Sequence, residues 1–273
     1  MSIEEKIQKV KKKLKLTPPF AGRNLTVFDD DIFITSYPKS GNTWTRFLIS
    51  NLLFPDEEIN FTNIEEKIPD IYLSSNKDIL RLNRPRIVKS HEYFDPRYQK
   101  VILIVRDPRD VLVSTYFHYI KYGFIDESLS IEAFGKGFLS NQYNAVGSHN
   151  LLGSWGENVG SWLGARGDDN FLIVRYEDLK QDIEVQLRRI AEFLGADCSS
   201  STISAAVENS SVKRMRALEK RETKVWPARQ TKRKDIAFVR SAKAGGWKEE
   251  LSDALAEDVR LRWESVMTPL GYV

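Results

Sequence analysis

The segment that most constrains the fold of this chain predicts a strand, a tight turn and a helix in direct succession, over residues 31–50. Residues 32–34 are apolar and are typical of a short, fully buried strand. The polar turn over residues 37–43 leads into residues 44–53, where apolar side chains recur at helical spacing. In α/β proteins such a turn can hold a phosphate, because free N–H groups at the helix N-terminus point at the anion and the helix dipole favours negative charge.

The turn differs from the nucleotide-binding P-loop, in which a lysine directly follows the second glycine. Here Lys39 stands two residues before Gly41, and Asn42 occupies the position of the P-loop lysine. Gly41 lets the backbone come close to a ligand. The alternative is an ordinary turn before a helix, with Thr43 as its cap. The sequence favours a phosphate cradle whose chemistry differs from that of a nucleotide P-loop.

Composition limits the class of protein. The length of 273 residues fits one large α/β domain, and we expect a single domain over residues 1–273. The net charge of +3 gives no nucleic-acid signature, so we expect no nucleic-acid partner. Cys198 is the only cysteine, and His91, His118 and His149 are not spaced for a zinc site, so we expect neither a disulfide nor a metal. No apolar run approaches ~18 residues and nothing resembles a signal peptide, so we expect no membrane span and a cytoplasmic location.

Strands alternate with helices along the rest of the chain. Further strands are predicted over residues 86–89, 101–105 and 171–175, and helices over residues 111–122, 154–163 and 251–267. Residues 176–179 end the last of these strands, and a helix runs on from there to about residue 194. This alternation predicts an α/β fold, a three-layer sandwich with a central parallel sheet. Two intervening segments are expected to form a binding wall and a cap over an apolar pocket, residues 56–85 and 123–145.

Two segments are rich in basic residues. Residues 1–16 predict a lysine-rich amphipathic helix, followed by a loop to residue 25. We expect this helix to pack on the domain, and peripheral contact with an acidic membrane surface is the alternative. Between Lys213 and Lys243 the chain has twelve basic residues and three acidic ones. Such a segment suits an anionic ligand or a solvated face.

Polar residues follow the ends of all four predicted strands. They are Lys39 and Ser40, Lys89 and His91, Arg106, Arg109 and Asp110, and Arg175 and Tyr176. Because parallel strands place these ends at one edge of the sheet, we expect the side chains to lie together. One histidine and several cations beside a phosphate-type turn favour group transfer from a phosphorylated donor. We expect His118 and His149 to be structural.

Three sequence blocks give the chain a resemblance to the cytosolic type of sulfotransferase, which uses 3′-phosphoadenosine 5′-phosphosulfate (PAPS). Residues 37–44 (YPKSGNTW) resemble the family's 5′-phosphosulfate loop. Residues 105–110 (VRDPRD), with Ser114 eight residues after Arg106, resemble its 3′-phosphate motif, and residues 238–248 (FVRSAKAGGWK) its C-terminal Arg-Lys-Gly loop. Two smaller blocks fall between them in the family order, residues 89–91 and 175–179. The resemblance implies the P-loop-like sulfotransferase fold and PAPS as the donor.

The resemblance also implies residue roles at the adenosine and the 5′-phosphate. The residues that would hold the 5′-phosphate are Lys39, Ser40, Gly41, Asn42 and Thr43. Lys39 would also stabilise charge on the bridging oxygen as the S–O bond breaks. Trp44 would stack on the adenine, Tyr176 would form a hydrogen bond with it, and Ser210 would lie near the same base.

Further roles concern the 3′-phosphate and the chemistry. Arg106, Ser114 and Arg240 would bind the 3′-phosphate. His91 would take the proton from the acceptor, and Lys89 would help to bind the sulfuryl oxygens. Part of residues 213–247 would form a lid over the donor. No carboxylate is clearly placed to hold Mg²⁺, although Asp107 and Asp110 must be considered.

Three departures from the family pattern bear on these roles. Ser241 and Ala242 stand in place of the Lys-Gly pair, which weakens the 3′-phosphate site unless Lys243 substitutes. Val212 stands where the family usually has an aromatic residue against the adenine. The family's short C-terminal dimer motif has no convincing match over residues 248–261, so the oligomeric state is open.

The acceptor and the function class leave alternatives. We expect transfer to a hydroxyl or amine of a small acceptor, with an apolar or aromatic alcohol favoured and a sugar or glycolipid hydroxyl as the alternative. A P-loop-like nucleotide kinase is a second hypothesis, although the missing Gly-Lys-Ser/Thr pattern argues against it. A non-enzymatic protein that binds anionic nucleotides or membranes is the third.

Overall fold

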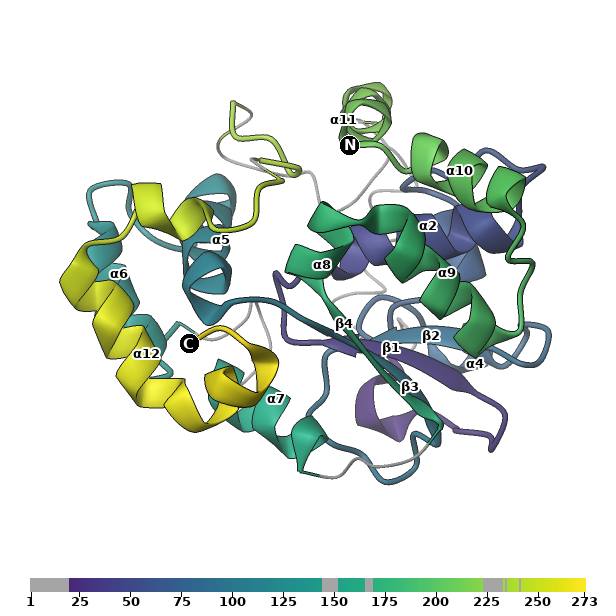
Figure 1. The fold of residues 1–273 in the computed structure, drawn as a ribbon, viewed down its shortest axis with the longest axis horizontal. Helices are drawn as coiled ribbons and strands as arrows, with labels where there is room; N and C mark the ends of the chain where they lie inside the picture. Colours follow the sequence, from purple (N-terminus) through teal and green to yellow (C-terminus); the bar gives the residue numbers. More distant parts are fainter. Residues whose placement is uncertain (1–19, 144–151, 165–168, 223–232, 234, 241) are drawn as a thin grey trace, which may run out of the picture.

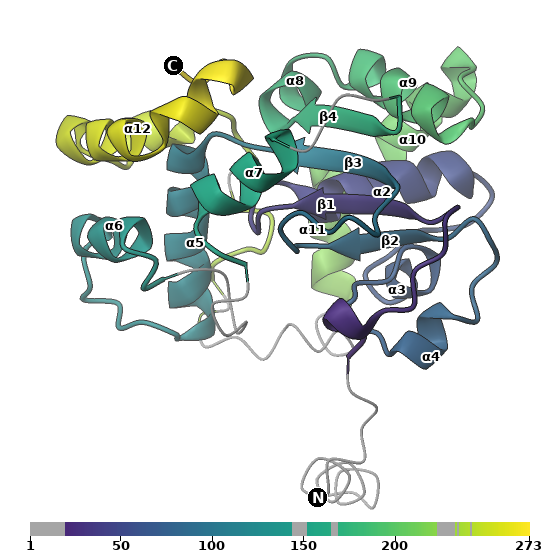
Figure 2. The ribbon, with the colours of Figure 1, turned by 90° about the horizontal axis from the view of Figure 1, so that it is seen from below.

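A computed structural model describes residues 20–143, 152–164, 169–222, 233, 235–240 and 242–273. The four strands are β1 (Ile32–Ser36), β2 (Ile87–Ser90), β3 (Lys100–Val105) and β4 (Phe171–Arg175), in the order β2-β1-β3-β4. All neighbours are parallel, with Ile32 opposite both Ile87 and Lys100. Figure 2 shows the strands side by side with their arrows pointing to the same end. The predicted central parallel sheet is confirmed.

The connecting segments are mainly helical. The α-helices are α2 (Asn42–Leu53), α3 (Ile64–Lys67), α4 (Asn76–Ile79), α5 (Pro108–Tyr122), α6 (Ile131–Leu139), α7 (Trp155–Leu163), α8 (Tyr176–Gln181), α9 (Ile183–Leu194), α10 (Ser200–Asn209), α11 (Val212–Arg221) and α12 (Asp253–Met267). Short 3₁₀-helices are η1 (Gly22–Asn24), η3 (Gly246–Glu249) and η4 (Thr268–Leu270). No helix in the described ranges has the length and apolar character needed to cross a membrane.

Helices cover both faces of the sheet, and alternating strand residues pack against them. Ile34 packs with Leu48 of α2 and Ile190 of α9, on the side where Figure 1 shows α2, α9 and α10. Phe33 belongs to the opposite cluster, with Trp155 and Trp162 of α7. Because strand side chains alternate between faces, two apolar residues in succession require cover on both sides. The predicted three-layer α/β arrangement is therefore confirmed.

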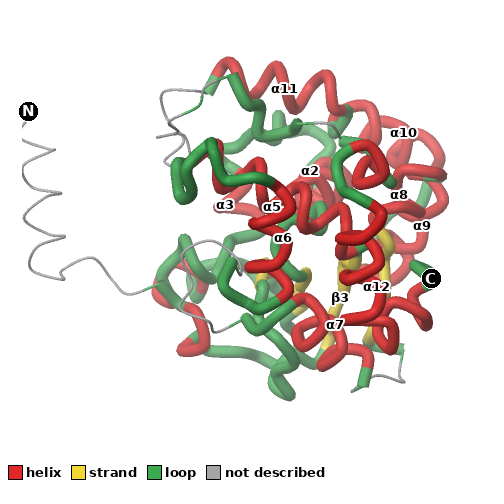
Figure 3. Tube along the Cα trace, turned by 90° about the vertical axis from the view of Figure 1, so that its left-hand side faces the viewer, coloured by secondary structure: helices red, strands yellow, loops and turns green. Residues whose placement is uncertain are grey.

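The order of the strands creates the place for a ligand. The chain passes from β1 to β2 on one side and then crosses to β3 on the other side of β1. Ligands of open α/β sheets bind beyond the carboxyl ends of the strands at such a reversal. Figure 3 shows α5, α6, α7 and α12 in front of these strand ends.

Some boundaries differ from the sequence-based expectation. Residues 176–179, expected to end β4, already belong to helix α8, and the helix predicted to run on to about residue 194 is divided, because Asp182 adopts a non-helical conformation and its side chain caps α9 at Val185 N. Gly195 ends α9 with a φ of 69°, as its predicted place at the helix end implies. Helix α5 starts at Pro108, because Asp107 accepts a hydrogen bond from Arg109 N as the cap. The predicted N-terminal basic helix, His149 and Ser241 lie outside the described residues.

Candidate active site

The loop after β1 has a backbone that few residues adopt. Lys39 has a φ of 71° and Gly41 a φ of 97°, both in the left-handed region. A Cβ on Gly41 would lie 2.5 Å from Cδ2 of Tyr176, so only glycine fits between the loop and this ring. The buried Ser40 Oγ and Asn42 Oδ1 have no hydrogen-bond partner among the described residues. Buried polar atoms are normally paired, so these two are available to a ligand.

Arg106, which directly follows β3, contacts the turn after β1, the C-terminal loop and helices α5 and α8. Its Nη1 donates to the Lys39 carbonyl at 3.2 Å, and its Nη2 donates to the Lys243 carbonyl at 3.0 Å. The guanidinium lies 4.3 Å above the ring of Tyr176 and 3.6 Å from Asp110. Within the described part of the chain, Arg106 Nε has no partner. The arrangement fixes a buried cation beside the turn and leaves one donor for an anion.

The two carboxylates considered for Mg²⁺ have structural partners. Asp110 accepts hydrogen bonds from Gly245 N at 2.8 Å and Trp247 N at 3.0 Å. Asp107 caps α5 and pairs with Arg109 at 2.6 Å. Across the described ranges, no group of three histidine, cysteine or acidic residues could hold a metal ion. The carboxylates thus hold the C-terminal loop and a helix start, and the absence of a metal stays a prediction.

The side chain of Lys39 meets α5 and the C-terminal loop. Its Nζ lies 3.2 Å from His118 Nδ1 and 5.4 Å from the ring of Phe238. Burial, with the charges of Arg106 and Lys121, lowers the pKa of Lys39 to about 7. A small cavity of about 20 Å³ joins Lys39 to two other predicted phosphate-binding residues, Ser114 and Arg240. The pocket is therefore a cluster of cations, which suits an anion.

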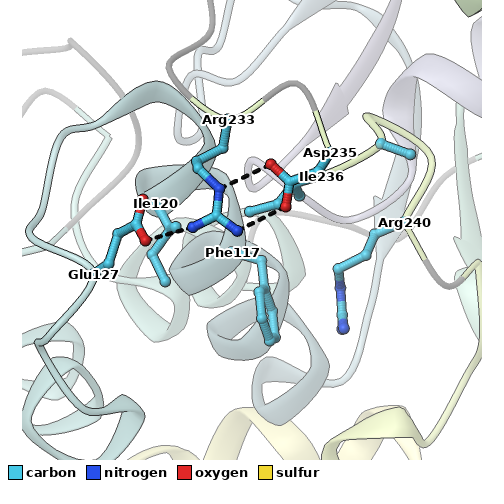
Figure 4. Close-up of a pocket in the computed structure, with 8 residues that line it drawn as sticks. Phe117, Ile120, Glu127, Arg233, Asp235, Ile236 and Arg240 are labelled. Carbon is cyan, nitrogen blue, oxygen red and sulfur yellow. Dashed lines mark hydrogen bonds and ion pairs between the residues drawn. The ribbon is translucent and has the colours of Figure 1, made fainter.

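Arg240 also borders a larger hollow of about 460 Å³ outside this cluster. Its guanidinium lies 4.0 Å above the ring of Phe117, and Nη1 donates to Glu250 at 3.0 Å. Figure 4 shows Arg240 beside Phe117 and, across the hollow, Arg233 between Glu127 and Asp235. The segment over residues 235–240 thus lies against α5, between the two cavities.

The three residues predicted to surround the adenine lie together. Trp44 Nε1 donates to the Ser210 carbonyl at 3.0 Å, and its ring is 5.8 Å from that of Tyr176 in an edge-to-face arrangement. Ser210 Oγ accepts a hydrogen bond from Asn51 Nδ2 at 3.0 Å. Val212 is the first residue of α11 and lies just beyond Ser210. The chain thus brings Ser210 alongside α2, where it contacts Trp44 in the first turn and Asn51 near the last, and places the Tyr176 ring against Trp44.

His91 lies beyond β2 and is fastened to the end of β1. Its Nδ1 lies 2.7 Å from the Ser36 carbonyl. Because a carbonyl only accepts, Nδ1 carries the proton and Nε2 keeps a free lone pair. Burial and the nearby charge of Lys89 lower the pKa of His91 to about 3. The imidazole is therefore neutral at physiological pH, with Nε2 unprotonated.

Lys89 has a carboxylate partner that the sequence did not indicate. Its Nζ donates to Asp70 Oδ2 at 2.5 Å, and both side chains are buried. Burial favours the neutral carboxyl, but the Lys89 charge holds the pKa of Asp70 below its ordinary value. Any contact between Lys89 and a sulfuryl group would share this ammonium with Asp70.

Sequence reasoning missed His118 and Asp70. His118 follows Ser114 by one helical turn on α5, and this i to i+4 spacing is the signal that could have found it. The Asp70–Lys89 pair joins a loop to a strand, and no local pattern predicts such a pairing. His91 lines neither of the two cavities described above.

Comparisons with known proteins agree with the family resemblance seen in the sequence. A family model described as "Sulfotransferase domain" matches residues 29–271. Sulfotransferase 2B1 of Mus musculus is 30% identical over 242 residues, which cover 85% of this chain and 69% of that protein. A 3-beta-hydroxysteroid sulfotransferase of Cavia porcellus is 29% identical over 242 residues, covering 85% of this chain and 82% of that protein. The crystal structure of mouse sulfotransferase SULT7A1 complexed with PAP superposes with a TM-score of 0.72 at 25% identity, over 90% of this chain and 87% of that one.

Proposed function

The chain belongs to the sulfotransferase family and uses PAPS as its donor, and we propose that His91 is the general base that activates the hydroxyl of a small apolar or aromatic alcohol. The residues that the family model matches, 29–271, include the whole sheet and the site around it. The proposal adds the acceptor class and the role of each residue.

The observation that carries the proposal is that the end of β1 holds both halves of the site. Ser36, the last residue of β1, accepts the hydrogen bond that fixes the His91 ring. Three residues later, the Lys39 carbonyl accepts the hydrogen bond from Arg106. A proton acceptor and a cation cluster therefore share one short backbone segment, which suits an in-line transfer between two bound substrates.

The residues present fit the donor. Ser40 Oγ and Arg106 Nε have no hydrogen-bond partner in the described part of the chain, and the backbone at Gly41 has no room for a Cβ; both are features of an anion cradle. We assign the 5′-phosphate to residues 39–43, with Lys39 beside the bridging oxygen. The 3′-phosphate is assigned to Arg106, Ser114 and Arg240.

The adenine is assigned to the cluster formed by Trp44, Tyr176 and Ser210. PAPS supplies the activated sulfuryl group. The chain's own contribution is to orient the donor, to stabilise charge with fixed cations and amides, and to accept the acceptor proton at His91 Nε2.

An apolar acceptor is supported by the surroundings of His91. The ring of Tyr72 stacks beside the imidazole at 6.2 Å, and Asn158 donates to the His91 carbonyl at 3.0 Å from α7, whose residues Trp155 and Trp162 are buried. One relative is named for 3-beta-hydroxysteroids, which are alcohols of this class. A sugar or glycolipid hydroxyl would need more polar partners than these rings offer.

The test is an acceptor screen with PAPS, followed by mass spectrometry, on the wild type and His91→Ala. We expect steroid and phenolic alcohols to be sulfated and free sugars not to be, without any requirement for Mg²⁺. Removing a general base costs ~10²–10⁴ in rate, so His91→Ala should lose turnover. Its affinity for PAP, the donor product adenosine 3′,5′-bisphosphate, should stay within about twofold by calorimetry, a change of ~0.4 kcal/mol. Tyr93→Phe, in the same loop, is the matched control and should keep full activity. Full turnover in His91→Ala would refute the base assignment, and sulfation of sugars alone would refute the acceptor class.

A further inference from the structure

His118 is the polar side chain nearest to Lys39 that the proposed mechanism does not use. It lies one turn after Ser114 on α5, and its Nδ1 is 3.2 Å from Lys39 Nζ. Its ring packs against those of Tyr122 at 4.4 Å and Phe124 at 6.4 Å, which fix the orientation of the imidazole. The contact thus joins the middle of α5 to the only lysine of the phosphate-type turn.

We propose that His118 is a positioning residue for Lys39: its Nδ1 accepts a hydrogen bond from the Lys39 side chain and holds it beside Ser114 and Arg240 before the donor binds. The inference rests on the proposed function in assigning Lys39 to the donor. The inference adds a residue on α5 that sets both the position of the Lys39 side chain and the fraction of its amine that is protonated.

The charges around Lys39 explain why such an acceptor is needed. Arg106 and Lys121 act on it with like charge, and Arg240 lines the same cavity. The nearby carboxylates are engaged elsewhere, since Asp110 faces Arg106 at 3.6 Å and Glu219 faces Lys121 at 3.4 Å. Within the described ranges, no carboxylate lies within 4.0 Å of Lys39 Nζ. Among the described residues, His118 Nδ1 is therefore the side-chain acceptor within hydrogen-bond distance of this ammonium, and the Phe238 ring lies 5.4 Å away.

The imidazole is in the right protonation state for this task. Burial, with the charges of Lys39 and Lys121, lowers the pKa of His118 to about 2, so the ring is neutral. A neutral ring with its proton on Nε2 presents a lone pair at Nδ1. A hydrogen bond to the charged form of Lys39 favours that form and opposes the lowering of its pKa to about 7.

A neutral acceptor suits a residue that must later meet an anion. A carboxylate at this position would bind the ammonium as an ion pair and compete with the phosphates of the donor. An apolar residue would leave the ammonium buried without a partner, which favours loss of its proton. Histidine at residue 118 holds Lys39 without either effect.

The experiment compares three substitutions that separate the position of the acceptor from size and polarity. His118→Asn places an amide oxygen close to the position of Nδ1. His118→Gln is equally polar but carries its oxygen one bond further out, near the position of Nε2. His118→Leu has no acceptor at all. Circular dichroism and thermal unfolding first confirm that each variant is folded.

The readout is the acylation of Lys39 in protein without donor, measured by mass spectrometry of its peptide as pH rises. We expect His118→Leu and His118→Gln to move the midpoint to lower pH by about one unit, a tenfold change in the protonation equilibrium. His118→Asn should keep the wild-type midpoint. Equal midpoints in all four proteins, or equal shifts in all three variants, would overturn the proposal.

The labelling result does not depend on activity. If the wild type fails to bind PAP, the proposed function fails while the Lys39 midpoints still decide the role of His118. If PAP binds and the midpoints do not differ, only the positioning role is lost. A second readout is the Michaelis constant for PAPS at mildly alkaline pH, which should rise about tenfold in His118→Gln and stay near the wild-type value in His118→Asn.

Discussion

Gly41 offers the sharpest test of how the turn after β1 is built. Its φ of 97° is one that L-residues rarely adopt, and a Cβ there would lie 2.5 Å from the ring of Tyr176. A left-handed conformation costs a residue with a Cβ ~1–2 kcal/mol, and forcing extra atoms into a packed site costs ~1–3 kcal/mol. Gly41→Ala should therefore lower the free energy of unfolding by ~2–5 kcal/mol.

Gly195 is the matched control for this substitution. Its φ is 69°, and a Cβ there would meet nothing within 4 Å. Gly195→Ala should therefore show the backbone cost alone, ~1–2 kcal/mol. The difference between the two variants, ~1–3 kcal/mol, measures the contact between the turn and Tyr176.

The assay is urea unfolding followed by fluorescence, with PAP binding measured by calorimetry on the same samples. Gly41→Ala should lose most of its affinity for PAP, and Gly195→Ala should keep it. In a Tyr176→Ala background the extra cost of Gly41→Ala should disappear. Equal losses of stability in Gly41→Ala and Gly195→Ala would refute the close approach of the turn to the ring.

Three further predictions follow from the charges of the site. The pKa of Lys39 is about 7 and a bound anion raises it, so above pH 7 the binding of PAP is coupled to the uptake of a proton. Calorimetry should show the affinity for PAP falling by up to about tenfold for each unit of rising pH, and Lys39→Met should abolish this dependence. Folding lowers the pKa values of His91 and His118 to about 3 and about 2, so below pH ~6.5 these histidines are protonated in the unfolded chain but not in the folded one. Urea unfolding should therefore show the free energy of unfolding falling with pH, by at most ~1.4 kcal/mol per pH unit for each histidine. A free energy of unfolding that rises as the pH is lowered from ~6.5 to ~5 would contradict this. Asp110→Asn leaves one acceptor for Gly245 N and Trp247 N, so it should lower stability by ~1–3 kcal/mol and speed hydrogen exchange at these two amides; unchanged exchange would show that Asp110 does not hold the loop.

The sheet and its order along the chain could be predicted because the strands are short apolar runs that end in polar residues. Residues 101–105 and 171–175 read as strands from sequence and are strands within one residue of those limits. Helix ends were less certain, since capping decides them. Asp182 interrupts the helix predicted to follow residues 176–179, because its side chain accepts a hydrogen bond from Val185 N. Such competition between a side chain and the helical backbone leaves only a weak signal in the sequence.

The site was predicted in part because parallel strands gather their carboxyl ends. Arg106 contacts the Lys39 carbonyl, as this reasoning implies. Trp44 contacts Ser210, two residues that the family resemblance, and not the strand ends, had placed near the same base. The Asp70–Lys89 pair and the His118–Lys39 contact escaped it, because each depends on packing between segments far apart in sequence. The assignment of each residue to part of the donor, the single domain and the cytoplasmic location stay predictions.

The central claim is that cations at neighbouring strand ends bind a nucleotide with two separate phosphates. Calorimetric titration of the wild type and Arg106→Leu with PAP and with 5′-AMP tests it most directly, since the two ligands differ only in the 3′-phosphate. The wild type should bind PAP at least about tenfold more tightly than 5′-AMP, and Arg106→Leu should remove most of that difference. Because Arg106 also donates to the Lys39 carbonyl, the variant should lose some affinity for 5′-AMP, but clearly less than it loses for PAP. A preference for PAP that survives in Arg106→Leu, or an equal loss for both ligands, would contradict the account.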